Sequence, residues 1–564
     1  MANKTEEFKC TGNGVFCDGN KICDYLKIIG LVKILAEKTW KVRLEFKDMA
    51  GEKCIIDVDS NKVRKTEDLI NDLTLKGLCP VVESSKFKKY VYQSVENREA
   101  IKRYIEVKQT GWIDEDFVCP SFCFSKNINY IYEDKNNSGY EQRGSFEEWE
   151  TNVSELCKGN SALIFAISEA FAAPLLKFFP SINSTIFNFV GKSSTGKTTV
   201  ARLASSVWGN YKNYVKQWRM TSNAQEIVSS LHNYTLLVLD ELSQAKDEEI
   251  KSIAYTIGNE NGKARMTASV GLREPIQWRT FGLSTAEIGI SEIIERLGKR
   301  VPEGISARFV DIYYPMDEEK GIFEDLHGFK ISKEFAEAIV ERASNYYGTA
   351  AEEYIKRLRE MPIERIKEIF AESLASLRKG CDISDEDMSN GLLSRVLNAF
   401  ALINAAGRIV SNDELGITNL GTVEIDAGVQ RILNICLPNL RKLKDKKEEI
   451  KQEITEWFKR NESYFIPTHR SAERRLTMDF KDVKTQVFGY KIEHENLYYL
   501  LPKNFKDFCR DIGVRIKEVK QILINSGVFE EYTEMDGKNS RKRIDAPIWI
   551  NGSRVRCIKA FLNG

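Results

Sequence analysis

The stretch Thr185-Ile-Phe-Asn-Phe-Val190-Gly191-Lys-Ser-Ser-Thr-Gly196-Lys197-Thr198 decides the fold of this 564-residue chain. Its mostly apolar first part, residues 185–190, predicts a strand that is buried on both faces. Residues 191–198 then fit the pattern G-x-x-x-x-G-K-[ST] at every fixed position, and a helical pattern runs from Thr199 to Val207. A buried strand, a glycine-rich turn and a helix in this order predict a phosphate-binding loop.

We expect this loop to hold the phosphates of ATP, because glycines let the backbone turn so tightly that successive N–H groups point at one anion. Lys197 is expected to place its cation on the β and γ phosphates, and the Thr198 hydroxyl to coordinate Mg²⁺. The predicted nucleotide-binding residues are Gly191, Lys192, Ser193, Ser194, Thr195, Gly196, Lys197, Thr198 and Thr199.

Two further strands end in polar residues that suit ATP hydrolysis. Leu236-Leu-Val-Leu precedes Asp240 and Glu241; Asp240 is predicted to hold Mg²⁺, and Glu241 to orient and deprotonate the attacking water. The apolar stretch from Trp278 ends at Ser284 and Thr285. Thr285, with Ser284 as second choice, is predicted to sense the γ-phosphate or the water, and the alternative is that this pair only caps the next helix.

Composition restricts the class of protein. The chain has 83 Lys and Arg against 82 Asp and Glu, yet residues 441–564 hold 27 Lys and Arg against 19 Asp and Glu. This basic end indicates either a polyanion partner such as nucleic acid or a solvated basic surface. No long uninterrupted apolar run and no apolar signal core is visible, so we expect a cytoplasmic protein without a membrane partner.

The twelve cysteines are scattered, which is typical of reduced thiols rather than of a disulfide scaffold. Cys119 and Cys123 have a spacing near that of a zinc pair, but none of the four histidines is close to them in sequence. Buried free thiols are the default expectation, and a zinc site stays open.

Periodicity predicts the organisation of the chain. Val42–Phe46 and Cys54–Val58 alternate as strands around a turn at 49–51, residues 66–78 and 96–108 look helical, and residues 330–412 are almost entirely helical. Strands and helices alternate between about 185 and 315, which predicts a parallel sheet. We predict four domains: 1–140, mixed α/β; 141–329, the ATPase core; 330–440, a helical lid and linker; and 441–564, the basic region.

Several separate blocks resemble the DUF927 family of mobile-element ATPases. They are Thr110-Gly-Trp112, the phosphate loop with its flanking strand, Ala204-Ser-Ser-Val-Trp-Gly209, Trp218-Arg-Met-Thr-Ser-Asn-Ala-Gln-Glu226 and Leu239-Asp-Glu-Leu-Ser243. In layout the chain resembles the MCM-like replicative helicases of staphylococcal cassette chromosomes and related islands. This resemblance implies an AAA+ core, a helical lid and a ring, expected to be a hexamer, that moves on single-stranded DNA.

The likeness to MCM helicases implies three further roles. Ser306-Ala-Arg308-Phe-Val-Asp311 is similar to an S-R-F-D stretch, with one extra residue, whose arginine reaches the γ-phosphate of a neighbouring subunit. Arg395 lies in a helix similar to the one that carries a second arginine acting in trans. Residues 261–275 read as a hairpin in the position of a pore hairpin, where Lys263, Arg265 and Arg273 would contact DNA phosphates. The alternative for each cation is a solvated or ion-paired surface position.

The C-terminal end has a winged-helix pattern: helices over 505–512 and 514–524, then a hairpin with its tip at 535–537. The predicted DNA contacts are Arg515, Lys517 and Lys520 on the second helix and Arg541, Lys542 and Arg543 on the hairpin. A protein-binding winged helix is the alternative.

Taken together, the sequence predicts an ATP- and Mg²⁺-dependent helicase of a mobile genetic element, which acts on single-stranded and forked DNA. The alternative is an AAA+ initiator or remodelling ATPase that binds DNA without processive unwinding.

Overall fold

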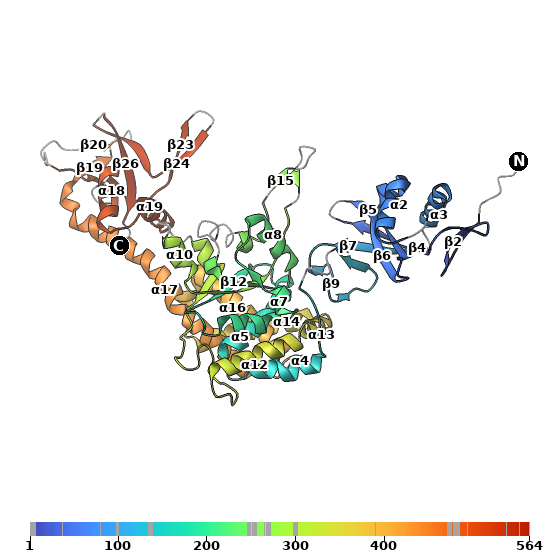
Figure 1. Ribbon diagram of the computed structural model, residues 1–564. Coiled ribbons are helices and arrows are strands. Elements are labelled where there is room, and N and C mark those ends of the chain that lie inside the picture. The colour runs from blue at the N-terminus through green and yellow to red at the C-terminus, as the bar shows by residue number, and fades with distance from the viewer. Residues whose placement is uncertain are drawn as a thin grey trace. The chain divides into compact units, whose positions relative to one another are not determined.

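The computed structural model divides into two compact units, Met1–Cys436 and Leu437–Gly564, each described by itself below (Figure 1). The structure describes residues 7–35, 38–78, 81–97, 101–133, 139–244, 250, 256–263, 265–266, 272–273, 275–296, 303–389, 391–470, 476–477, 486–492, 495–536, 539–551 and 553–562. The four predicted domains remain a prediction, since this division does not separate the first three.

A mixed five-stranded sheet forms the centre of the N-terminal region, in the order β11-β7-β4-β5-β6. Alternating side chains on β5 explain its register, because Val42, Leu44 and Phe46 are buried in a core shared with helices α2 and α3. The strands predicted around residues 42–46 and 54–58 are therefore present. The elements are β4 (Leu26–Ile34), β5 (Thr39–Lys47), β6 (Lys53–Asp59), α1 (Ser60–Arg64), α2 (Thr66–Leu75), α3 (Ser84–Glu96), β7 (Lys102–Val107) and β11 (Asn129–Tyr132), preceded by the antiparallel sheet of β1 (Phe8–Thr11), β2 (Gly14–Cys17) and β3 (Asn20–Cys23).

The predicted helix over 96–108 is wrong. Residues 102–107 form β7, which pairs in parallel with β4 on one side and β11 on the other. These pairings satisfy the backbone on both edges of β7, and Lys41 from β5 donates to the buried carboxylate of Glu106 at 2.7 Å. Both stabilising contacts come from residues distant in sequence, so local periodicity could not reveal them.

A second small sheet contains the Thr110-Gly-Trp112 motif, whose side chains contact residues of the region around the central parallel sheet. It consists of β8 (Gly111–Ile113), β9 (Asp116–Val118) and β10 (Cys123–Phe124). The Thr110 hydroxyl donates to Asn233 O at 2.8 Å, and the Trp112 indole donates to Pro174 O at 2.9 Å. Gly111 has φ +95°, and a Cβ there would lie 2.6 Å from Asn233 O. In this structure the motif therefore serves as an anchor between two parts of the chain.

The predicted parallel sheet is present, with strand order β13-β14-β17-β12-β18. Its strands are β12 (Thr185–Val190), β13 (Lys216–Gln217), β14 (Leu236–Asp240), β17 (Phe281–Ala286) and β18 (Phe309–Ile312). Helices α5 (Ser161–Ala172) and α6 (Lys197–Ser205) pack on β14 and β17. Phe187 packs against Phe165 of α5, whereas Ile186 joins a core with Trp218 and Leu237. Both faces of β12 are thus covered, as its continuous apolar sequence requires.

The helical region is also as predicted: α12 (Ser332–Asn345), α13 (Thr349–Leu358), α14 (Ile363–Gly380), α15 (Asp385–Ser389) and α16 (Gly391–Val410) follow the sheet. By length and composition α16 could cross a membrane, but 78% of its apolar window is buried inside the structure. It packs against α5 and α14, as a core helix does. The helix expected over 441–462 is the end of α17 (Thr422–Arg460).

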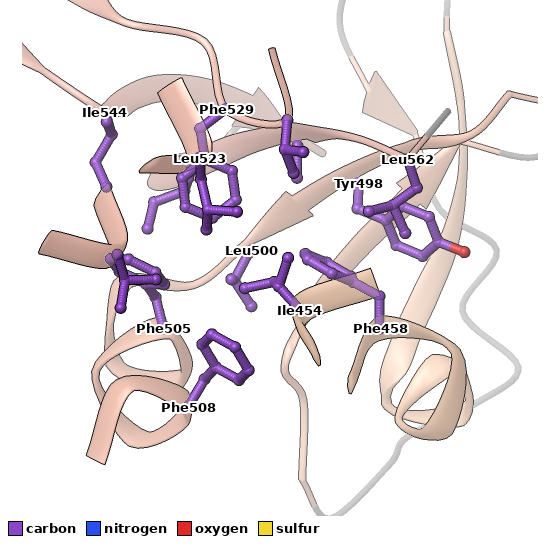
Figure 2. Close-up of a cluster of buried hydrophobic side chains, with 14 of the residues drawn as sticks. Ile454, Phe458, Tyr498, Leu500, Phe505, Phe508, Leu523, Phe529, Ile544 and Leu562 are labelled. Carbon is purple, nitrogen blue, oxygen red and sulfur yellow. The ribbon is translucent and has the colours of Figure 1, made fainter. Parts of the chain in front are cut away.

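The C-terminal unit contains a closed barrel, in the order β19-β20-β25-β26-β22-β21. Figure 2 shows the core beneath it, where Ile454 and Phe458 of α17 meet Leu500, Phe505 and other apolar side chains. The elements are β19 (Phe465–Arg470), β20 (Leu476–Thr477), β21 (Gly489–Ile492), β22 (Leu497–Leu500), α18 (Pro502–Asp511), α19 (Ile516–Asn525), β23 (Tyr532–Asp536), β24 (Asn539–Arg543), β25 (Asp545–Ile550) and β26 (Ser553–Phe561).

The two helices and the hairpin β23–β24 agree with the sequence pattern, but the barrel was not predicted. It closes through pairs such as β20 with β25 and β22 with β26, which join segments far apart in the chain. Several of these strands are short, so their sequences carry little alternation of their own.

One buried histidine predicts a pH dependence of stability. His232 is fully buried beside Tyr140 and Tyr214, and burial lowers its pKa to about 3. Its pKa in the unfolded chain is about 6.5, so below that pH the unfolded state binds the extra proton and stability is lost. Between pH 7.5 and 5.5 we expect this group to cost about 1.4 kcal/mol.

Denaturant unfolding at both pH values measures this loss. In His232→Gln the part of the pH dependence due to this residue should disappear, whereas His327→Gln, a change at a partly exposed ring, should retain it. An unchanged pH dependence in His232→Gln would contradict the assignment.

Candidate functional site

The phosphate loop joins the end of β12 to the start of α6 with two residues in left-handed backbone conformations. Ser194 has φ +61° and Gly196 has φ +99°. A Cβ at Gly196 would lie 2.8 Å from Ile322 Cγ2, so a glycine is needed there for space as well as for φ. The loop is held from outside by the Ile322 N–H, which donates to Thr195 O at 2.9 Å.

Lys197 lies inside this loop and donates to Gly191 O at 2.9 Å and to Lys192 O at 2.6 Å. The side chain is mostly buried, and burial lowers its pKa, while the nearby carboxylates of Glu287 and Asp240 act in the opposite direction. A partly desolvated ammonium whose hydrogen bonds go to two carbonyl oxygens can form stronger, charge-assisted hydrogen bonds with an anion. The arrangement therefore suits phosphate binding.

Asp240 is the centre of a short hydrogen-bonded group at the carboxyl ends of β14 and β17. Its Oδ1 accepts from Thr285 Oγ1 at 2.5 Å and from Thr198 Oγ1 at 3.3 Å. The structure thus brings together the loop threonine and the strand-end carboxylate that the sequence predicted as Mg²⁺ ligands. Hydroxyl and carboxylate oxygens are the donors that Mg²⁺ prefers, so this group fits the ion.

Glu241 follows in a strained conformation, with φ +62°. Its N–H donates to Thr285 Oγ1 at 3.0 Å, and its carboxylate accepts from the Gln244 amide. A non-glycine residue at positive φ persists when its surroundings impose it, and such residues concentrate at functional sites. Through the hydrogen bonds of its Oγ1, Thr285 contacts both Asp240 and Glu241.

Ser284, the second choice for the sensor, points elsewhere. It is fully buried and accepts from the Trp218 indole at 2.9 Å. Because side chains alternate along a strand, only one residue of the pair can face the loop, and the geometry places Thr285 there.

These side chains line one cavity of about 560 Å³, within the usual range for ligand sites. The same cavity has a wall that the sequence did not reveal, from the segment after β18 and the first turn of α12. The wall residues are Gly321, Phe323, Ser332, Lys333 and Ala336. No motif marks them, because they reach the loop through tertiary contacts, which are the hydrogen bond from Ile322 to Thr195 and the packing of α12 on α6.

Arg308 and Arg395 lie together at the opposite end of β12. Both line a small pocket with Asn183 and Asn398. Arg308 O accepts from the Ile186 N–H at the start of β12, whereas the phosphate loop begins after Val190, roughly 16 Å further along the strand. An arginine side chain is shorter than this separation. The guanidinium groups in this pocket therefore do not reach the phosphate loop of their own chain along β12.

The Arg308 side chain has an unusual setting. Among the described residues its buried Nε has no hydrogen-bond partner, and its stem passes so close to Gly258 that a Cβ there would lie 2.4 Å from Arg308 Cδ. Asp311, at the end of the same motif, accepts from the Asn188 amide at 2.7 Å, and burial raises its pKa to about 6. This hydrogen bond joins β18 to β12, and Arg308 directly precedes β18.

The predicted hairpin is present as β15 (Arg265–Met266) and β16 (Leu272–Arg273), with Arg265 opposite Arg273. The side chains of these two arginines lie outside the described residues. Lys263, at the base, donates to Ser222 Oγ at 2.9 Å, and its N–H donates to the buried Glu226 carboxylate at 3.3 Å. Both partners belong to α8 (Ser222–Leu231), which Figure 1 shows beside β15.

The C-terminal cations differ in their surroundings. Lys517 is exposed on α19, and Arg515 and Lys520 lie at its start and along it. On the hairpin, Lys542 pairs with Glu531 at 2.9 Å, and Arg543 forms a bidentate pair with Asp545 at 3.0 and 3.1 Å. The Arg541 side chain lies outside the described residues. Both cations therefore already have a carboxylate partner, and Arg543 is the less suited of the two to bind DNA, because two hydrogen bonds hold its guanidinium on Asp545.

Cys119, which directly follows β9, is buried, and Cys123, the first residue of β10, is exposed. Among the described residues there is no group of three or more His, Cys, Asp and Glu side chains that could hold a metal ion.

Residues 11–276 match the family model described as "Domain of unknown function (DUF927)". The predicted resemblance to DUF927 is confirmed. Among solved structures the chain is similar to one named "SCCmec type IV Cch - active helicase", with a TM-score of 0.64 and 17% identity over 100% of this chain and 98% of the other. At this identity the likeness shows a shared fold. Curated proteins gave no match.

The DUF927 match covers the anchor at Thr110–Trp112, the phosphate loop and the Asp240–Glu241 strand end. It stops before Thr285, Arg308 and Arg395. Thr285 and the two arginines therefore lie beyond the family match, and their description depends on the geometry given above.

Proposed function

We propose that the protein is an ATP-dependent DNA helicase of a mobile genetic element, built on an AAA+ core with a helical lid and a C-terminal winged helix. In this proposal it forms a hexameric ring and translocates on single-stranded DNA. The strand order of the central sheet supports the AAA+ assignment, because the strand of the phosphate loop lies between β17 and β18 and next but one to the Asp240 strand. The full-length likeness to a structure named as an active helicase supports the activity.

One observation carries the proposal: Arg308 and Arg395 share a pocket at the end of β12 opposite to the phosphate loop. An ATPase needs a cation for the charge that develops on the γ-phosphate. If these arginines supply it, they must do so for a second copy of the chain. ATP would then lie between subunits, so hydrolysis is coupled to assembly.

Within one site the residues divide the chemistry. Lys197 and the loop N–H groups bind the phosphates, Glu241 accepts a proton from the attacking water, and Thr285 orients Glu241 and Asp240 through its two hydrogen bonds. Thr198 and Asp240 would hold Mg²⁺, which when bound supplies positive charge to the phosphate oxygens. The cavity wall keeps the nucleotide beside these groups.

A strand-displacement assay with 3′- and 5′-tailed duplexes tests the proposal. We expect wild-type protein with ATP and Mg²⁺ to release the labelled strand from one kind of tailed substrate, and Lys197→Ala to release none. ATP hydrolysis and DNA binding without displacement of either substrate would favour the alternative, an AAA+ initiator or remodelling ATPase.

The two functions also depend on different cations. Helicase activity requires pore contacts, so changing Lys263 or Arg265 should abolish unwinding while ATP binding remains. An initiator would depend mainly on Arg515, Lys517 and Lys520 of the winged helix.

A further inference from the structure

Three aromatic rings form a stack at one end of the C-terminal barrel. The Phe488 ring lies 5.4 Å from the Trp457 ring, at an interplanar angle of 11°, and 4.7 Å from the Tyr464 ring, at 21°. Trp457 belongs to α17, Tyr464 ends the short 3₁₀ helix Glu462–Tyr464 directly before β19, and Phe488 directly precedes β21. These three residues, here called the aromatic stack, therefore come from three separate segments of the unit.

The aromatic stack is held by backbone hydrogen bonds and by a helix. The Tyr464 N–H donates to Asn461 O, and the Tyr464 carbonyl accepts from the Phe488 N–H, both at 2.9 Å. At the other end, the Trp457 ring packs edge-on against the ring of Phe508 on α18, a residue labelled in Figure 2, at 5.7 Å. The ring positions are therefore preorganised before a ligand arrives.

Solvent exposure increases along the aromatic stack. Trp457 and Phe488 are half-buried and pack against the apolar core of the unit, whereas Tyr464 is 38% exposed. Because one face of the Tyr464 ring lies on Phe488, the exposed area belongs to its edge and opposite face. An accessible aromatic face on a rigid support is the surface on which a nucleobase stacks in proteins that bind single strands.

The charges near Tyr464 favour a polyanion. Lys459 and Arg460 are exposed in the last turn of α17, and Arg460 lies three residues after Trp457, on the same side of the helix. Glu462, the acidic residue nearest to Tyr464 in sequence, is paired with Lys491. Residues 441–564 as a whole have 27 Lys and Arg against 19 Asp and Glu. A basic surface beside an accessible ring matches the backbone and bases of a nucleic-acid strand.

We propose that Tyr464 is a stacking platform for a base of single-stranded DNA, and that Lys459 and Arg460 contact phosphates beside that base. The base packs on the exposed face of the tyrosine ring, and Phe488 and Trp457 support the ring from behind. In a duplex the base faces are covered by their stacked neighbours, so the platform favours single strands. This inference rests on the proposed DNA helicase and adds a contact separate from the predicted cations of the pore hairpin and winged helix.

Equilibrium binding of the full-length protein to two labelled strands tests the proposal. One is oligothymidylate and the other is an abasic strand of the same length, which has the phosphates but no bases. We expect the wild type to bind oligothymidylate about 5- to 150-fold more tightly, the contribution of one base stacked on an aromatic ring. Tyr464→Ala should lose most of this preference and retain its affinity for the abasic strand. Tyr464→Phe should keep the preference, because the ring remains.

Trp549→Ala is the matched control, because Trp549 is a more exposed aromatic residue of the same unit, at 52%, and lies on β25 outside the aromatic stack. It should keep the wild-type preference. Equal wild-type affinities for the two strands, an unchanged preference in Tyr464→Ala, or the same loss in Trp549→Ala would overturn the platform. Wild-type protein that bound neither strand would instead refute the proposed DNA partner, on which the platform depends.

The two cations have a different signature. Changing Lys459 and Arg460 together to Gln should weaken the binding of both strands to the same extent, since phosphates are common to both. The slope of log affinity against log salt concentration should fall in magnitude by about 0.7 for each cation removed. An unchanged slope would overturn the phosphate contacts.

A further measurement needs no variant. Irradiation of wild-type protein with oligothymidylate that contains 5-iododeoxyuridine should crosslink a peptide that includes Tyr464, because a halogenated base reacts with the aromatic ring on which it stacks. Unlabelled oligothymidylate should compete for this crosslink far better than the abasic strand. Crosslinks confined to peptides elsewhere in the chain would overturn the platform, even if Tyr464→Ala failed to fold.

Discussion

Arg308→Ala is expected to lower the rate of ATP hydrolysis by about 10³–10⁵-fold, the usual contribution of an arginine that stabilises charge on a transferred phosphoryl group. The expected loss is in turnover, measured by phosphate release at saturating ATP, whereas ATP binding should persist because Lys197 and its loop are untouched. Arg308 lines its pocket at the start of β18, away from its own phosphate loop, so the group it serves would belong to another subunit.

Mixing inactive variants tests this directly. The Arg308→Ala protein keeps Lys197, and the Lys197→Ala protein keeps Arg308. Mixed assemblies should therefore contain some interfaces in which a wild-type Arg308 of one subunit faces a wild-type Lys197 of the next. Part of the activity should return after subunit exchange, and a small fraction of repaired interfaces is enough to measure against a loss of this size. A mixture that exchanges subunits but stays inactive would argue against complementation in trans.

Arg296→Ala is the matched control for Arg308. Arg296 is an exposed arginine in the last turn of α10 (Ile290–Arg296) and lies outside the pocket that holds Arg308 and Arg395. We expect Arg296→Ala to hydrolyse ATP at close to the wild-type rate. An active Arg308→Ala protein together with an inactive Arg296→Ala protein would show that Arg296, and not Arg308, is the arginine that stabilises the charge on the γ-phosphate.

Glu241→Gln should bind ATP but lower its turnover by about 10²–10⁴-fold, the contribution of a positioned general base. The amide retains the size of the side chain but cannot accept a proton from water. The strained backbone of Glu241 and its contact with Thr285 position the carboxylate at the cavity, so the substitution tests the chemistry with little change in shape. Single-turnover hydrolysis and nucleotide-binding titrations separate the two effects.

Glu318→Gln gives the comparison for Glu241→Gln, because Glu318 is an exposed carboxylate that does not line the cavity. Its turnover should match the wild type. If Glu241→Gln hydrolysed ATP normally, the base would have to be another carboxylate of the cavity, for which Glu287 is the first candidate.

Much of the candidate site could be read from the chain because each part carries its own local signal. The continuous apolar run 185–190, the glycines of the loop and the apolar run before Asp240 are contiguous in sequence. Parallel strands place their carboxyl ends on one edge of a sheet, so Asp240 and Thr285 could be expected beside the loop. The distances from Asp240 to Thr198 and Thr285 agree with that expectation.

The N-terminal and C-terminal regions show where local signals end. Residues 102–107 looked helical, yet β4 and β11 offer them hydrogen bonds on both edges, and Glu106 finds a lysine from β5. The C-terminal barrel likewise closes through pairings between distant short strands. Such contacts are decided by which segments meet, and periodicity within one segment does not contain that information.

The sequence by itself determined the phosphate loop, the parallel sheet and the resemblance to DUF927, because these depend on residues adjacent in the chain or on one repeated pattern. The tertiary structure alone decided that Thr285 rather than Ser284 faces Asp240, that Arg308 and Arg395 share a pocket, and that α12 lines the cavity at the phosphate loop. Each of these results depends on the direction of a side chain or the packing of one helix on another. Those are set by the burial of the whole core and not by any single stretch of sequence.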